Sequence, residues 1–152
     1  MERDELKRHM EVVYNRCCAI LKDPDQAWDA LQDVFESFYE ASKKREIRQP
    51  LFYLYRSSTN HCFNMLRRQK KLLPLLTEHL EGDLGGHHTA ENRLMIDALV
   101  QQFGEDTIQL FIYRHVDQMT YDEIADLVGL SDRGVKKKLA RLEEKIRQQF
   151  PT

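Results

Sequence analysis

The sequence predicts an all-α fold: two small helical domains joined by a flexible linker, the second domain holding a helix-turn-helix. Apolar residues recur every three or four positions along nearly the whole chain, and no stretch alternates convincingly with a period of two. An acidic segment containing proline and a glycine pair interrupts this pattern at 73–89. We therefore expect one domain over 1–72, a linker over 73–89 and a second domain over 90–152.

The bulk composition is that of a soluble globular protein. The chain has 152 residues, of which 41% are hydrophobic and 32% are charged. No apolar run approaches the roughly 18 residues that would span a membrane. The charged N-terminal segment lacks the apolar core of a signal peptide. We therefore expect a cytoplasmic protein with no direct membrane insertion.

Cysteine and histidine spacing does not indicate a metal centre. Cys17, Cys18 and Cys62 show no CxxC spacing, which argues against a disulfide framework and against a zinc ribbon. His87 and His88 follow a glycine pair and have no cysteine or carboxylate at a ligand spacing. We expect no metal and no cofactor, and a metal- or redox-sensing switch is a weak alternative.

Charge is distributed in blocks along the chain. Residues 51–72 hold five basic and no acidic side chains, and residues 133–152 hold seven basic and two acidic ones. Between them, residues 73–132 hold twelve acidic and two basic side chains. Two basic blocks on an acidic background suggest two separate contacts with a polyanion. A pI near 6.3 argues against a protein that coats nucleic acid indiscriminately.

The first two helices are separated by the sequence "KDPD". Asp23 is placed to cap a second helix, and Pro24 suits its first helical position. We expect the inward faces to contain Leu6, Met10, Val13, Cys17, Ile20 and Leu21 in the first helix, and Ala27, Leu31, Phe35 and Phe38 in the second.

The second helix also carries an acidic stripe. Its members recur at spacings of four, three and four, with Gln32 beside them, and they are Asp29, Asp33, Glu36 and Glu40. No basic residue stands four positions later, so a ladder of intrahelical ion pairs is not expected. The stripe is either a solvated face or a docking face for a basic protein. Paired-carboxylate catalysis is not expected, because no nucleophile, phosphate loop or metal-ligand set accompanies it.

A basic loop over 41–50 leads into a third helix, expected from about Pro50 to Lys71. Polar residues and one aromatic recur along it at spacings of three, four, four and three: Tyr53, Arg56, Asn60, Asn64 and Arg67. Asn and Arg side chains bind base edges and phosphates, and aromatic rings stack on unpaired bases. The stripe therefore indicates a nucleic-acid contact, and an ordinary basic helix end is the alternative.

Four further helices are expected, over roughly 90–103, 105–116, 120–128 and 131–149. Ala125, Gly129 and Val135 show the spacing of a helix-turn-helix, in which glycine adopts the left-handed turn and Ser131 caps the second helix. Basic residues project from the outer side of that helix, which is the side that meets DNA in this motif. They are Arg133, Lys136, Lys137 and Arg141. A solvated basic face on a helical hairpin is the alternative.

Three segments together resemble a known family. "DQAWDALQDVFESFYE" (25–40) resembles the second conserved region of bacterial sigma factors, and "YLYRSSTNHCFNMLRR" (53–68) resembles its continuation. "YDEIADLVGLSDRGVKKKLARL" (121–142) resembles the fourth region. The chain is similar over about 5–148 to the small, two-domain extracytoplasmic-function (ECF) sigma factors of the sigma-70 family, and the similarity begins at that family's second helix.

The resemblance implies a non-enzymatic subunit that binds core RNA polymerase and directs it to promoter DNA. Core binding would involve Asp29, Gln32, Asp33, Phe35 and Glu36. The −10 element would be bound by Tyr53, Arg56, Asn60, Asn64, Arg67 and Arg68. The −35 element would be bound by Ser131, Arg133, Lys136, Lys137 and Arg141. An anti-sigma factor is a further partner that the resemblance leaves open.

Departures from the family pattern keep two other functions open. Trp28 stands where the family often has Glu, Tyr53 where it often has Trp, and Gly134 where it usually has Thr. A sigma-like adaptor would bind polymerase or an anti-sigma factor without initiating transcription. A stand-alone helix-turn-helix regulator would dimerise and bind an operator tightly without polymerase.

Overall fold

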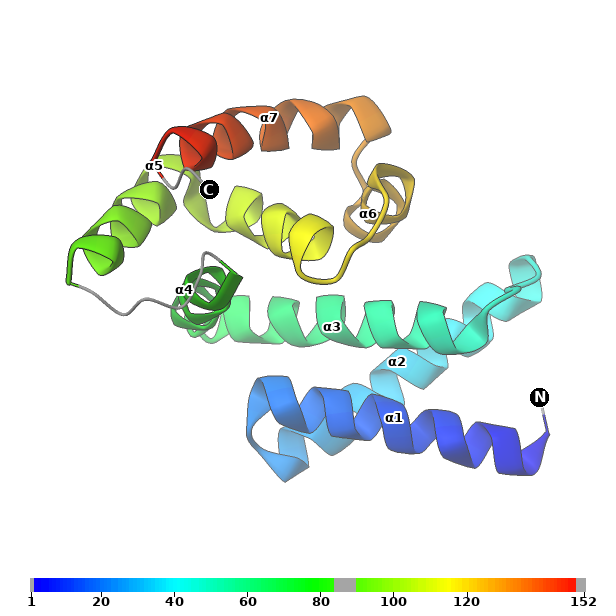
Figure 1. Ribbon diagram of the computed structural model, residues 1–152. Helices are drawn as coiled ribbons and strands as arrows, with labels where there is room; N and C mark the ends of the chain where they lie inside the picture. The colour runs from blue at the N-terminus through cyan, green and yellow to red at the C-terminus, as the bar shows by residue number, and fades with distance from the viewer. Residues whose placement is uncertain (1, 84–89, 150–152) are drawn as a thin grey trace. The chain divides into compact units, whose positions relative to one another are not determined.

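The computed structural model describes residues 2–83 and 90–149, which form helices α1 to α7 and no strand (Figure 1). The chain divides into two compact units, Met1–Gln69 and Lys70–Thr152. The all-α prediction is confirmed. Within the described ranges, no helix combines the length and apolar character needed to cross a membrane.

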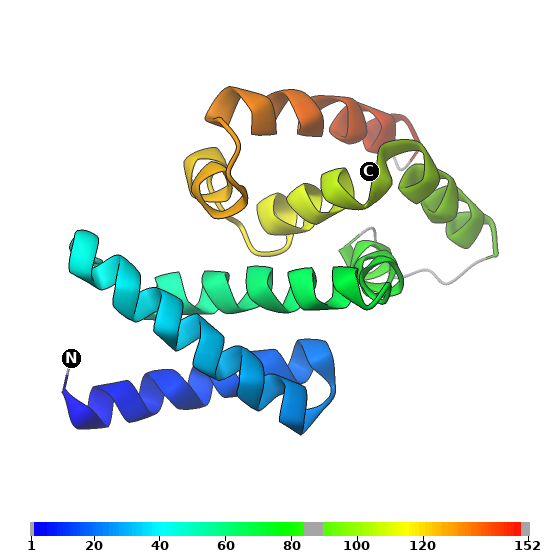
Figure 2. The same cartoon turned by 180° about the vertical axis from the view of Figure 1, so that it is seen from behind.

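The first unit is a three-helix assembly of α1 (Arg3–Leu21), α2 (Pro24–Lys44) and α3 (Pro50–Arg68). Each helix contacts the other two, and α2 crosses the roughly side-by-side pair α1 and α3 (Figure 2). The side chains of all three meet in one core, which includes Val13, Cys17, Leu31, Leu54, Cys62 and Phe63.

Local signals set the start of α2. The Asp23 carboxylate accepts hydrogen bonds from the backbone N–H groups of Asp25 and Gln26, at 3.0 and 3.3 Å. Pro24 occupies the first turn, where a missing N–H has no cost. The predicted cap is therefore confirmed.

The expected inward faces are confirmed only in part. On α2, Ala27 and Leu31 are buried as expected, but Phe35 and Phe38 are half-buried, and Ala30 and Val34 complete the core face. On α1, Val13, Cys17, Ile20 and Leu21 are buried, Met10 is half-buried, and Leu6 in the first turns is 37% exposed. The small residues on α2 mark its true contact face because helices approach most closely there.

The second unit contains α4 (Leu72–Asp83), α5 (Ala90–His115), α6 (Tyr121–Val128) and α7 (Asp132–Gln149). Gly104 interrupts α5 with φ of 82° and ψ of 166°, so this helix consists of two segments. The segments correspond to the separate helices expected over 90–103 and 105–116. A positive φ is tolerated there because glycine has no Cβ.

Helix α4 corrects the expectation that 73–89 lacks regular structure. Leu72, Leu76 and Leu80 recur every four residues, are fully buried, and belong to a helix that packs against α5. Pro74 lies in the first turn of α4, where proline does not interrupt a helix. Residues 84–89, which include the glycine pair and His87 and His88, lie outside the described residues.

The helix-turn-helix forms from α6 and α7 as predicted. Thr120 and Glu123 form a reciprocal capping box at the start of α6. Gly129 ends α6 with φ of 75°, in the left-handed conformation that favours glycine. The inner stripe of α7 is buried against the rest of the unit and consists of Val135, Leu139, Leu142 and Ile146.

Candidate nucleic-acid interface

The outer face of α7 is basic over its N-terminal half. Arg133, Lys136, Lys137 and Arg141 are all exposed, as predicted. Val135 and Leu139, which lie between them in sequence, are fully buried. Because the helix turns once every 3.6 residues, the buried apolar residues and the exposed basic residues lie on different sides of α7. The basic side chains therefore point away from the core.

Ser131 forms the cap of α7. Its Oγ accepts a hydrogen bond from the Gly134 N–H at 3.0 Å. A Cβ placed on Gly134 would lie 3.1 Å from that oxygen, which is a tight contact. Glycine at this position therefore leaves room for the capping hydroxyl. This contact gives Gly134 a local role in the turn, in addition to any role at a DNA surface.

Tyr121, at the start of α6, lies between two cations that sequence reasoning did not connect. The Arg114 guanidinium carbon is 4.5 Å from the ring centroid, and Lys136 Nζ is 5.3 Å from it. Arg114 also donates to the Met119 carbonyl at 2.9 Å, and Lys136 forms an ion pair with Asp132 at 3.7 Å. Side chains from α5, α6 and α7 thus gather two positive charges around one aromatic ring.

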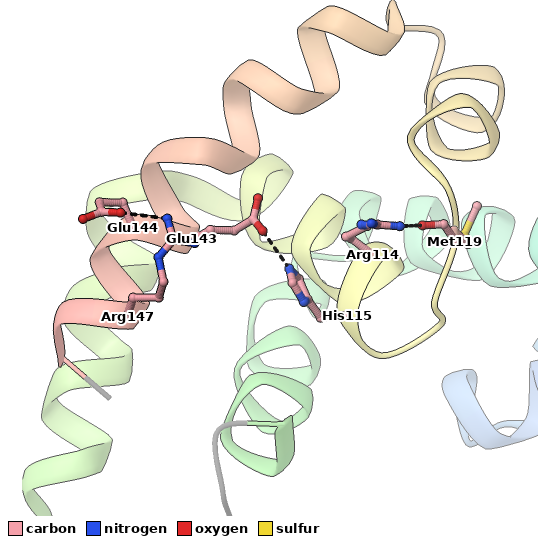
Figure 3. A network of polar contacts seen from close by, with 6 residues as sticks. All are labelled: Arg114, His115, Met119, Glu143, Glu144 and Arg147. Atoms are coloured by element: carbon pink, nitrogen blue, oxygen red, sulfur yellow. Dashed lines mark hydrogen bonds and ion pairs between the residues drawn. The ribbon is translucent and has the colours of Figure 1, made fainter. Parts of the chain in front are cut away.

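Two acidic residues of α7, Glu143 and Glu144, lie in its C-terminal half and have partners there (Figure 3). His115 Nε2 of α5 lies 3.2 Å from Glu143 Oε2, and the imidazole stacks on Phe111 with centroids 4.3 Å apart. Arg147 donates to Glu144 at 2.7 Å. That hydrogen bond and the charge of Arg147 hold the pKa of Glu144 below its usual range. These two carboxylates lie away from the basic N-terminal half of α7, where Asp132 in the first turn pairs with Lys136.

The polar stripe of α3 lies on one side of the helix and is half-buried. Tyr53, Arg56, Asn60, Asn64 and Arg67 share this intermediate exposure, while Arg68 is exposed. Arg67 Nη1 donates to Asn64 Oδ1 at 2.8 Å, which orients both side chains. The predicted residues are therefore gathered on one helix face.

Aromatic residues extend this stripe at the start of α3. The Tyr53 ring lies 5.8 Å from that of Phe38 on α2, and the Arg45 guanidinium lies 5.9 Å from the Tyr53 centroid. Phe52 is 57% exposed, and Arg56 lies 5.7 Å from its centroid. Sequence reasoning missed Phe52, although a large exposed aromatic beside a stripe of Asn and Arg is a signal for base stacking.

The acidic stripe of α2 faces solvent. Asp29, Gln32, Asp33 and Glu36 are exposed, and Phe35 is half-buried beside them. The stripe is not wholly without partners: Asp33 lies 3.4 Å from His61 Nε2 on α3, and Glu40 lies 3.4 Å from Lys43 Nζ three residues later. Among the described residues, no group of three or more His, Cys, Asp or Glu side chains could hold a metal ion.

Comparison with known families matches both units. Residues 6–72 match the family described as Sigma-70 region 2, and residues 93–146 match Sigma-70, region 4. The chain belongs to the sigma-70 family. The ferric citrate uptake sigma factor FecI of Escherichia coli (strain K12) is 27% identical over 131 residues, which cover 82% of this chain and 76% of that protein. No solved structure gives a significant match.

As a sigma factor, the protein directs RNA polymerase to promoters, and its family implies that it binds core polymerase and promoter DNA. Region 2 spans α1 to α3, and region 4 spans nearly all of α5 to α7. This pairing of regions confirms the ECF prediction. The exposed faces of α2, α3 and α7 are therefore the surfaces through which this sigma factor would bind its partners.

Proposed function

We propose that this sigma factor uses three helix faces: α2 binds core polymerase, α3 binds the −10 element together with the segment 41–50, and α7 binds the −35 element. The first four residues of that segment, expected in a loop, form the last turn of α2, so only 45–49 connect the two helices. The observation that carries this proposal is the exposed acidic face of α2 in a chain with two basic faces. DNA repels an acidic surface, so that face suits a basic protein partner. A stand-alone regulator would have no use for it.

At the −10 element, the half-buried stripe of α3 would hold an unstacked base. Unstacking costs a few kcal/mol, and contacts with the extruded base offset that cost. Tyr53 and Phe52 supply rings for stacking, while Asn60 and Asn64 supply amide groups for base edges. Arg67 and Arg68 supply charge for the neighbouring phosphates.

At the −35 element, α7 would enter the major groove with its N-terminal half. Arg133 and Lys137 lie one turn apart on the exposed face and suit base edges, whereas Arg141 lies one turn further on and suits a phosphate. The Ser131 hydroxyl already caps the helix, and a hydroxyl can accept one hydrogen bond and donate another. Ser131 would therefore donate to a phosphate while it keeps its capping role.

Neither DNA contact needs high affinity alone. Core polymerase would hold both units near the promoter, so each binds its element at a high effective concentration. This proposal places the protein in the cytoplasm with core polymerase. An anti-sigma factor that covers the acidic face of α2 would compete directly with polymerase.

Tyr121 provides a test of the −35 assignment. Replacing Tyr121 with Leu should weaken promoter binding by the holoenzyme by up to about 5- to 30-fold, because Arg114 and Lys136 lose cation–π contacts worth about 0.5–1 kcal/mol each at exposed sites, or about 1–2 kcal/mol together. Tyr121→Phe keeps the ring and should change binding less than about 2-fold. Filter binding across a salt series measures both. Equal losses in the two variants would assign the effect to the hydroxyl instead.

Co-elution tests the proposed function as a whole. The purified protein should co-elute with core polymerase on size exclusion and should bind free promoter DNA weakly. An adaptor would co-elute but would not support initiation from any promoter. Failure to co-elute, combined with tight and specific binding to free DNA, would favour the stand-alone regulator and refute the proposal.

A further inference from the structure

The core of the first unit holds two thiols at the interface between α1 and α3. Cys17 of α1 and Cys62 of α3 are both fully buried, and the two helices pack side by side and run in the same direction (Figure 1). Arg16 Nε donates to Thr59 Oγ1 at 3.0 Å, which fixes the register of α1 against α3. Cys17 directly follows Arg16, and Cys62 lies about one helical turn after Thr59, so the register brings the thiols together.

The two thiols form a hydrogen bond, and their chemical environments differ. The Cys62 thiol donates to the Cys17 sulfur, and this hydrogen bond lowers the pKa of Cys17 against the opposing effect of burial. The positive charge of Arg16 also lowers the pKa of Cys17. The same hydrogen bond, together with burial, raises the pKa of Cys62. Cys17 therefore loses its proton first, and the thiolate is the nucleophilic form of cysteine.

We propose that Cys17 and Cys62 form a peroxide-sensitive site, where oxidation joins α1 to α3 by a disulfide bond. The Cys17 thiolate attacks hydrogen peroxide, breaks the O–O bond and becomes a sulfenic acid, and the released hydroxide takes up a proton to leave as water. The Cys62 sulfur then attacks the Cys17 sulfur, and its proton leaves with the sulfenic hydroxyl as a second water. Two thiols are thus oxidised by two electrons while one peroxide is reduced to two waters.

The disulfide would act as a covalent cross-link within the first unit. It would close a loop that contains the whole of α2. Such a cross-link restricts the unfolded chain and thereby stabilises the folded unit. Hydrogen peroxide is barely larger than water, so it reaches the buried pair when α1 opens locally. Because α3 also carries Tyr53, Asn60 and Asn64, the stability of that polar stripe would depend on oxidation.

Cys18 is the third thiol of this region and differs from the other two. It is half-buried and forms a hydrogen bond with Tyr14, which raises the pKa of the tyrosine. Adjacent residues have Cα atoms about 3.8 Å apart, whereas disulfide-bonded cysteines usually have them about 4.4–6.8 Å apart. A bond between Cys17 and Cys18 is therefore disfavoured. If exposure alone governed oxidation, Cys18 would react before the buried pair.

Oxidation of the full chain by hydrogen peroxide tests the proposal. Digestion without reduction, followed by mass spectrometry, should show the Cys17 and Cys62 peptides joined, with the mass of two hydrogen atoms lost. Cys18→Ser should form the same cross-link, which removes any ambiguity from the neighbouring thiol. The Tm of the first unit should rise by roughly 5–15 °C on oxidation and return to its original value with a thiol reductant. In urea, this selectivity for one pair should disappear.

Cys62→Ala identifies the thiol that reacts first. This variant should form no cross-link, should show no rise in Tm, and should carry a sulfenic acid on Cys17 that dimedone labels. Labelling of Cys18 instead would contradict the proposed order of attack. If peroxide leaves the native wild type reduced, oxidises only Cys18, or forms the cross-link without raising the Tm, the inference is overturned. Because none of these measurements needs polymerase or DNA, they are independent of the proposed function.

Discussion

Replacing Arg133 and Lys137 together with Ala should reduce promoter-specific transcription by roughly 100-fold or more, while affinity for core polymerase stays unchanged. Each good bidentate contact with a base contributes about 1–3 kcal/mol of discrimination against the wrong base. Because the free energies of two lost contacts add, the two fold-losses in promoter recognition multiply. Both side chains are exposed and lie on the face of α7 opposite its buried stripe, so their loss should not unfold the second unit. Transcription assays and core-binding assays on the same preparation measure the two properties.

The matched control removes the same charge from the other end of α7. Lys145→Ala combined with Arg147→Ala also deletes two positive charges, but both lie beyond the basic N-terminal half, and Arg147 already pairs with Glu144. This control should retain most of the transcription. If promoter-specific transcription falls equally in the control and in the Arg133/Lys137 variant, net charge rather than contact with base edges governs binding to the −35 element. If the Arg133/Lys137 variant also loses core binding, the proposed division of labour is wrong.

Reversing the charge of Asp29 and Asp33 with Lys should abolish binding to core polymerase. Charge pairs across protein interfaces contribute about 1.5–7 kcal/mol when they are close, and reversal replaces attraction with repulsion, so at least a roughly 100-fold loss is expected. Both residues are exposed, and the lost contact between Asp33 and His61 should cost no more than about 1 kcal/mol of stability.

The control for this reversal lies on α1. Asp4→Lys combined with Glu11→Lys makes the same change in net charge at two exposed acidic residues of the same unit. Surface plasmon resonance with immobilised core should show near wild-type affinity for it. A similar loss in both variants would mean that polymerase senses the overall charge of the first unit, and the α2 face would then have no special role.

Features of this fold that are set by neighbours in the sequence were predictable. Asp23 followed by Pro24 predicts where α2 begins, because capping and ring geometry act within one turn. Gly129 predicts where α6 ends, since a left-handed residue is required there. The outward direction of Arg133 and Lys137 follows from the period of the buried stripe of α7.

Features that depend on packing between helices were not predictable in the same way. Helix α4 was missed because Pro74 resembles a helix breaker, and only its contact with α5 explains the burial of Leu76. The contacts of Tyr121 with Arg114 and Lys136 join three helices, so no spacing along the chain reveals them. The exposure of Trp28 likewise depends on which side of α2 meets α1 and α3.

Transcription in vitro with purified core polymerase tests most directly whether this protein starts transcription at specific promoters. Genomic fragments are transcribed by core polymerase alone and by core polymerase with this protein. We expect discrete transcripts that appear only when the protein is present and that disappear in the Arg133/Lys137 and Asp29/Asp33 variants. A protein that binds core polymerase but yields no discrete transcript from any fragment would contradict promoter-directed initiation.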